Sequence, residues 1–171
     1  MDILNKNYFE LFDINVSIDL NKSILDEKVK KLQLTFHPDK FANSTARERK
    51  IALMISSHIN DGYKILSDIV LRVEYILKIN NYEIDDSKTI NDENFLQLQI
   101  KYSEIIDSLN ITKNQDSIKS NIQDLKIETR DIVSEIKDCY EKSNFHGMWL
   151  ALSRLRFFKK NIKQLGSLLT I

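Results

Sequence analysis

The residues able to do acid–base, nucleophilic or metal chemistry are few and scattered in this sequence. There are three histidines, His37, His58 and His146, and a single cysteine, Cys139. No serine, cysteine or carboxylate accompanies a histidine in a spacing typical of a catalytic group, and the paired spacing of zinc ligands is missing. The sequence therefore predicts no enzyme, no metal site and no cofactor.

One histidine belongs to a string that indicates binding instead. The chain has a single proline, and it lies in TFHPDKF, residues 35–41. Pro38 stops a helix and stiffens the turn, which lowers the entropy cost of ordering that turn on a partner. Asp39 is suited to a charge-assisted hydrogen bond with a partner's arginine or amide. A plainer alternative is that His37 only caps the end of the preceding helix, where a cation is favourable.

The elements that position this string are predicted to be helices. Among 171 residues there are one proline and three glycines, too few for the turns of a β architecture, so the fold class is all-α. Lysine plus arginine and aspartate plus glutamate each number 25, which argues against nucleic acid as a partner. No apolar run is long enough for a membrane span, and with one cysteine and no recognisable targeting segment we expect a cytoplasmic protein.

Apolar periodicity predicts the helices and two domains. Asp19 is the expected N-cap of the second helix, and Asn43 or Ser44 that of the third. The polar run over 80–94 marks a boundary, after which short connections favour an antiparallel three-helix bundle. The predicted domains are 1–78 and 94–171, with 79–93 as a linker. The predicted helices span about 7–13, 20–36, 44–67, 69–80, 94–109, 116–143 and 146–169.

Two of these helices carry apolar residues away from their predicted inner face. On the helix that begins near residue 94, Leu96 and Ile100 lie on the side opposite its apolar stripe, and Glu104 continues their line. On the last helix, Phe157 is predicted to point away from the face formed by its neighbours. This face either packs on the N-terminal domain or forms an apolar, acid-rimmed patch that binds a protein. The predicted inner stripes are Leu25, Val29, Leu32 and Phe36; Ile55, Ile59, Tyr63 and Leu66; Phe95, Leu98, Tyr102, Ile106 and Leu109; and Leu152, Leu155, Phe158 and Ile162.

The first 78 residues or so resemble a J-domain. The resemblance rests on His-Pro-Asp-Lys after an aromatic residue, Phe36, and on SHINDGYKILSD at 57–68. It implies that the turn and the basic face of the preceding helix dock on the ATPase domain of a DnaK-class chaperone and promote ATP hydrolysis there. The implied docking residues are His37, Pro38 and Asp39, supported by Lys28, Lys30, Lys31 and Lys40. Under the plainer alternative these lysines are an ordinary solvated face.

Over nearly its full length the chain is similar to the HscB family of J-type co-chaperones, which serve iron–sulfur cluster assembly. HPDKF, LRVEYIL and RLRFFKK, at 37–41, 71–77 and 154–160, carry this resemblance. It implies that the bundle binds the scaffold protein IscU and that the chaperone partner is HscA. The implied scaffold-binding residues are Leu96, Ile100, Glu104 and Phe157. The sequence departs from the family's pattern at Thr35, Ile69, Gln97, Lys101 and Ser108.

The sequence therefore predicts an adaptor that holds a client scaffold on its bundle while its J-domain engages an ATP-bound chaperone. Two tethered contacts act through effective concentration and need no catalytic residue. The alternatives are a J-domain co-chaperone with a different client, or a structural helical adaptor in which the motif is accidental.

Overall fold

The computed structural model describes residues 2–84 and 93–169, and within them every regular element is a helix. The predicted all-α class is confirmed. The chain divides into two compact units, Met1–Asn81 and Tyr82–Ile171. Most of the predicted linker lies outside the described residues. No helix of the described part is long and apolar enough to cross a membrane.

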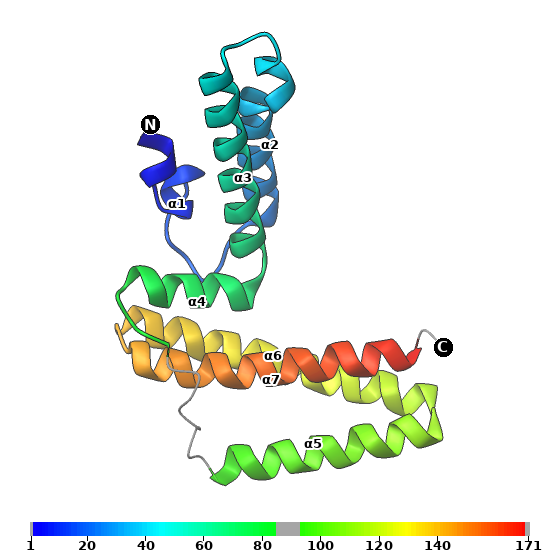
Figure 1. Cartoon of the computed structure of the whole chain (residues 1–171). Helices are drawn as coiled ribbons and strands as arrows, with labels where there is room; N and C mark the ends of the chain where they lie inside the picture. Colours follow the sequence, from blue (N-terminus) through cyan, green and yellow to red (C-terminus); the bar gives the residue numbers. More distant parts are fainter. Residues whose placement is uncertain (1, 85–92, 170–171) are drawn as a thin grey trace. The chain divides into compact units, whose positions relative to one another are not determined.

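The N-terminal unit is built on a hairpin of two long helices (Figure 1). α2 and α3 lie side by side, and α1 packs against α3. Short 3₁₀ turns precede α1 and join α2 to α3. The elements of the unit are η1 (Asp2–Asn5), α1 (Tyr8–Leu11), α2 (Lys22–Phe36), η2 (Pro38–Phe41), α3 (Ala46–Ser67) and α4 (Ile69–Ile79).

Two predicted helix starts are wrong by one to two residues. α2 is capped by Asn21, whose side chain accepts hydrogen bonds from the next turn, and not by Asp19. α3 is capped by Thr45 in a capping box with Glu48, and not by Asn43 or Ser44. All four residue types make good caps, so type alone could not choose between them. The Thr-x-x-Glu spacing was the signal that identifies the start of α3.

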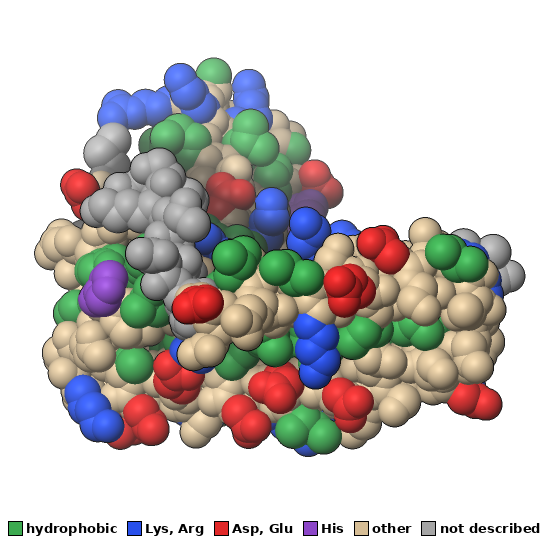
Figure 2. Space-filling model, turned by 90° about the horizontal axis from the view of Figure 1, so that it is seen from below, with side chains coloured by type: hydrophobic (Ala, Val, Ile, Leu, Met, Phe, Trp, Pro, Cys, Tyr) green, Lys and Arg blue, Asp and Glu red, His purple; other side chains and the backbone are tan. Residues whose placement is uncertain are grey.

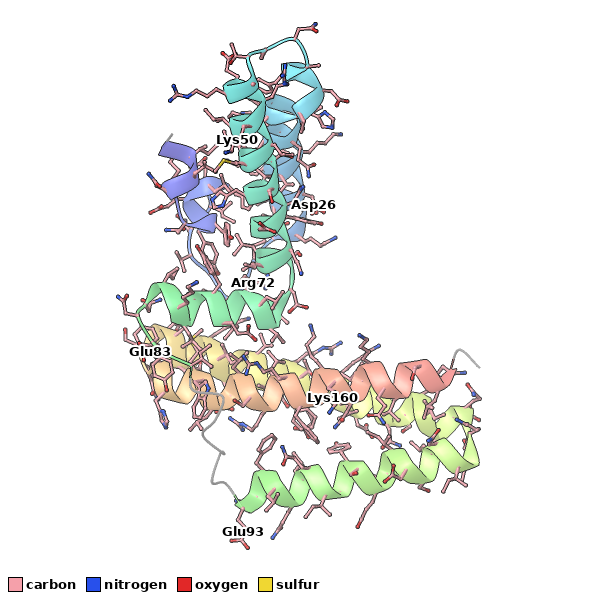
Figure 3. All side chains as sticks on the ribbon, viewed as in Figure 1. Asp26, Lys50, Arg72, Glu83, Glu93 and Lys160 are labelled. Carbon is pink, nitrogen blue, oxygen red and sulfur yellow. The ribbon has the colours of Figure 1, made fainter. Side chains whose placement is uncertain are left out.

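The core of the N-terminal unit follows the predicted stripes. Leu25 and Val29 of α2 are buried, whereas Leu32 and Phe36, nearer the turn, are only half-buried. A buried arginine of α4, Arg72, lies at the end of the hairpin opposite the α2–α3 turn (Figure 3). Its guanidinium donates to the backbone oxygens of Ile18 and Leu66, and burial lowers its pKa. The loop before α2 is thereby tied to the end of α3.

The C-terminal unit is the predicted three-helix bundle. α5 (Glu93–Thr112), α6 (Gln115–Glu141) and α7 (Phe145–Leu169) are joined by short turns. α6 and α7 pack along their lengths, and α5 packs on α7. The predicted stripe of α5 is buried except for Leu98, which is half-buried. The largest buried side chains of the other two helices include Ile118, Leu125, Ile136, Met148, Leu152, Leu155 and Phe158.

Within residues 2–84 and 93–169, four helix ends are closed by residues in the left-handed conformation, and none of these is a glycine. The φ angles of these residues lie between 51° and 58°. Glycine is the usual choice there because it has no Cβ to clash. The sequence uses other residue types instead, which are Asp13, Asn81, Lys113 and Ser143.

Candidate functional site

The His-Pro-Asp string forms the turn between α2 and α3. Pro38 occupies the first position of η2, where its missing N–H removes no hydrogen bond. The His37 ring caps this turn, because its Nδ1 accepts from the Asp39 backbone N–H at 3.3 Å. The His37 carbonyl accepts from the Lys40 N–H at 3.0 Å. His37 is the C-cap residue of α2, as the plainer alternative expects, and its side chain in addition caps η2.

The turn directs the carboxylate of Asp39 into solvent. Its side chain is 90% exposed, and Asp39 Oδ2 lies 3.6 Å from Nδ1 of His37. The backbone that carries Asp39 is fixed by Pro38 and by the two hydrogen bonds of His37. A partner can thus reach an acceptor whose position is largely set before binding, which reduces the entropy lost on association.

The four predicted lysines are not equivalent. Lys30, Lys31 and Lys40 are exposed. Lys28 is instead held by Asp13 of the preceding loop, with Nζ and Oδ2 2.8 Å apart. This hydrogen bond and the lysine's charge lower the pKa of Asp13. Lys28 thus ties the loop to α2, and the charge of Lys31 also acts on the carboxyl of Asp13. Lys30 and Lys40 lie beside the turn, where they line a groove together with His37.

A shallow groove of about 400 Å³ lies beside the turn, and the sequence analysis missed two of its residues. Leu34 is 59% exposed in the middle of this basic face. It lies off the buried stripe of α2, so the helical-wheel argument applied to Leu96 and Ile100 would have found it. Gln33 carries no such signal. The groove is lined by Lys30, Gln33, Leu34, His37 and Lys40.

The second predicted site lies on α5. Leu96 and Ile100 are 56% and 53% exposed, one turn apart, and Glu104 follows them in the same line. The side of the C-terminal unit that carries α5 exposes hydrophobic side chains interspersed with carboxylates (Figure 2). The structure thus brings three of the four predicted scaffold-binding residues onto one exposed strip, which we call the α5 strip.

The fourth residue, Phe157, does not point away from the interior as predicted. It is half-buried, and its ring makes edge contacts with Phe95 and Tyr102 of α5, at centroid distances of 5.6 and 6.3 Å. The prediction compared Phe157 only with the face that α7 turns to α6. Because α5 packs on another side of α7, a second part of that helix is buried. Phe157 thus touches the residue that precedes Leu96.

The two remaining histidines lie against aromatic rings, and the cysteine is half-buried. The His58 ring lies against Tyr8, and His146 meets the hydroxyl of Tyr82 at 3.0 Å and the ring of Trp149. Burial raises the pKa of the Cys139 thiol, which makes it a poor nucleophile at neutral pH. In the described ranges, 2–84 and 93–169, no three His, Cys, Asp or Glu side chains are grouped to hold a metal ion.

Comparison with known proteins assigns the family. No family model matches the chain. A co-chaperone protein HscB homolog of Mannheimia succiniciproducens is 31% identical over 156 residues, which is 90% of each chain. A homolog of the same name from Haemophilus ducreyi is 28% identical over 94% of each chain.

Solved structures agree. Chaperone HscB from Vibrio cholerae superposes with a TM-score of 0.87 at 26% identity, covering 95% of this chain and 96% of that one. Human co-chaperone protein HscB has the same fold, with a TM-score of 0.87 at 23% identity, over 95% of this chain and 81% of the human one. The class of the protein is thus that of the all-α co-chaperones. The chain belongs to the HscB family.

Proposed function

We propose that this protein delivers an IscU-type iron–sulfur scaffold protein to a DnaK-class chaperone, HscA, and stimulates the ATPase activity of that chaperone. One observation carries the proposal: a chain of the HscB family presents Asp39 to solvent on a turn fixed by Pro38. A location in the cytoplasm stays a prediction of the sequence, as does the assignment of residues 1–78 as a J-domain.

The chaperone contact would combine one fixed acceptor with a basic, partly apolar surface. Asp39 would accept a charge-assisted hydrogen bond, and Lys30 and Lys40 would orient the approach of an acidic surface. Leu34 supplies apolar area in the same groove. Because the lysines are exposed, their contribution should weaken as salt is added.

The scaffold contact would use the α5 strip. Leu96 and Ile100 are the two apolar anchors, and burying each stabilises a complex by about 1.5–3 kcal/mol. Glu104 supplies a polar rim. Phe157 supports the strip from α7 by packing on Phe95.

The first test measures ATP turnover by the chaperone HscA with and without the full-length protein. Asp39→Asn keeps the size of the side chain but removes its charge, and it should abolish most of the stimulation. Asp26→Asn is the matched control, because Asp26 lies on α2 outside the turn and is paired only with Lys22 at 3.6 Å among the ion pairs of the described residues. Stimulation that survives Asp39→Asn at the wild-type level would exclude the docking role of the turn.

The same assay includes a variant of the α5 strip. Leu96→Ala with Ile100→Ala should weaken binding of the IscU-type scaffold by about 100-fold, the loss expected when two anchors are truncated. ATPase stimulation by the free protein should persist. Ile127→Ala, on an exposed position of α6, is the control. Phe157 is avoided because its truncation would also remove contacts with Phe95 and Tyr102. Unchanged scaffold binding would mean that the scaffold binds at another site, or that the client of the α5 strip is another protein.

A further inference from the structure

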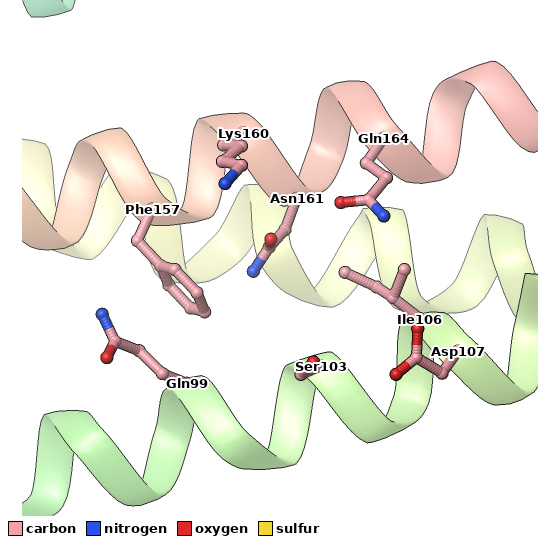
Figure 4. A pocket seen from close by; sticks show the side chains of 8 residues that line it. All are labelled: Gln99, Ser103, Ile106, Asp107, Phe157, Lys160, Asn161 and Gln164. Atoms are coloured by element: carbon pink, nitrogen blue, oxygen red, sulfur yellow. The ribbon is translucent and has the colours of Figure 1, made fainter.

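A polar pocket of about 260 Å³ lies between α5 and α7, next to the α5 strip (Figure 4). α5 and α7 supply four lining residues each. These are Gln99, Ser103, Ile106 and Asp107 from α5, and Phe157, Lys160, Asn161 and Gln164 from α7.

A buried amide without a partner points into this pocket. Asn161 is only 5% exposed, and its side chain extends from α7 toward α5 (Figure 4). Among the residues that the structure describes, nothing accepts a hydrogen bond from its Nδ2. A buried donor in this state costs free energy that an incoming oxygen acceptor would recover. The pocket therefore selects for an acceptor.

The pocket lining contains one cation, which can hold an anionic acceptor. Lys160 lines it from α7, and residues 145–169 contain five lysines and arginines but no aspartate or glutamate. One of these cations, Arg154, is paired with Glu135 of α6. Asp107 on α5 is the opposing charge in the lining. Ammonium and amide donors together hold a carboxylate through charge-assisted hydrogen bonds, and Asp107 would weaken that binding by repulsion.

The pocket continues the α5 strip. Leu96, Ile100, Ser103 and Asp107 follow one another at intervals of four, three and four residues, so they lie on one face of α5. The first two are the exposed apolar anchors, and the last two line the pocket. Phe157 forms part of the pocket wall and packs on Phe95. A partner seated on the strip would therefore meet the pocket at the same time.

We propose that this pocket binds the carboxylate of an aspartate or glutamate side chain from the protein that docks on the α5 strip. The inference rests on the proposed function, which places the scaffold there. The Nδ2–H of Asn161 and the ammonium of Lys160 donate to the carboxylate. The strip would supply apolar affinity, and the pocket would fix the register of the partner along α5.

The test measures the Kd of the IscU-type scaffold for full-length variants by calorimetry. Asn161→Asp replaces the donor by a negative charge and should weaken binding by about tenfold or more. Lys160→Gln should weaken it about three- to tenfold, while Asp107→Asn should strengthen it about two- to threefold. Lys163→Gln is the matched control, because it removes an exposed lysine of α7 that does not line the pocket. The side chains of Lys160, Lys163 and Asp107 are exposed, so we expect these three variants to fold. They keep the test informative if Asn161→Asp fails to fold.

A second measurement identifies the ligand chemistry directly. Glutarate, a free dicarboxylate, should shift the side-chain amide NMR signals of Asn161 in the full-length protein, and the scaffold should shift the same signals. Substituting the scaffold's acidic residues one by one should reveal one whose loss is non-additive with Lys160→Gln. Shifts with glutarate but not with the scaffold would overturn the assignment to the docked partner.

The outcomes separate the two proposals. If Leu96→Ala with Ile100→Ala weakens scaffold binding but Lys160→Gln behaves like Lys163→Gln, the pocket proposal fails and the proposed function stands. If the wild-type protein does not bind the scaffold at all, the proposed function fails. If neither glutarate nor scaffold shifts the Asn161 amide, the pocket holds only water and the inference is overturned.

Discussion

At the scale of single residues, one glycine shows how closely the N-terminal unit is packed. A Cβ on Gly62 of α3 would lie 2.7 Å from the ring of Tyr8 and 3.0 Å from that of Phe12. Phe12 is fully buried, and the half-buried Tyr8 ring contacts the rings of His58 and Tyr75, which limit its movement. The short helix α1 can approach α3 only because this position lacks a side chain.

We therefore expect Gly62→Ala to lower the free energy of unfolding. Alanine gains about 1 kcal/mol of helix propensity, but overpacking two aromatic rings costs about 1–3 kcal/mol, and we expect the clash to dominate. Gly166→Ala is the matched control, since a Cβ there meets no atom within 4 Å. That control should stabilise α7 by up to about 1 kcal/mol. Urea unfolding followed by far-UV circular dichroism measures both, and equal effects would contradict the packing argument.

At the scale of helices, the turn between α6 and α7 stores strain at a residue that is not glycine. Ser143 follows the end of α6 with φ at 52°. Its N–H donates to Tyr140, and the N–H of Asn144 donates to the Cys139 carbonyl at 2.8 Å. The hydrogen bonds of a left-handed helix end are thus in place, but a Cβ disfavours the conformation.

Ser143→Gly should therefore raise the free energy of unfolding by about 1 kcal/mol, because glycine adopts this conformation without strain. Ser134→Gly is the opposite control. Ser134 is exposed within α6, and glycine there should lower stability by about 0.5 kcal/mol. Chemical denaturation with Trp149 fluorescence reports on this unit. A loss of stability in Ser143→Gly would show that the serine side chain makes a contribution larger than the backbone strain.

At the scale of the whole molecule, the two proposed sites lie in different compact units of one chain. The turn at 37–39 belongs to Met1–Asn81 and the α5 strip to Tyr82–Ile171. Joining two binding sites covalently raises the effective concentration at which the second contact forms. The affinity of the joined pair can then exceed that of either site alone by about 10²–10⁴-fold. The proposed delivery function depends on this tether.

Mixing two singly defective proteins should therefore fail to restore function. Asp39→Asn keeps the α5 strip, and Leu96→Ala with Ile100→Ala keeps the turn, but neither chain carries both. The labelled scaffold is used at a concentration below its own Kd for the chaperone. Under this condition the wild-type protein should load the scaffold onto the chaperone. To reach the same loading of the chaperone, the mixture should need about 100-fold more scaffold, because in the mixture the two sites are not on one chain. Equal loading by the mixture and the wild type would contradict a role for the tether.

Local signals in the sequence predicted most of the helices and the turn. Apolar spacing gives the buried stripe of α5, and Pro38 gives the end of α2. The exposure of Leu96 and Ile100 followed from the same spacing, because a helix has a fixed period. The observed helix caps, Asn21 and Thr45, could not be told from nearby residues by type alone, because those residues have similar side-chain chemistry.

The sequence by itself determined the helical class, the position and stiffness of the His-Pro-Asp turn and the exposed anchors of α5, since each depends on neighbours within a few residues. Only the tertiary structure decided the environment of Phe157, the pairing of Lys28 with Asp13 and the pocket at Asn161. Those features depend on which helices pack together. A helical wheel describes one helix at a time, so it cannot say that α7 is covered on two sides or that a buried amide has been left without a partner.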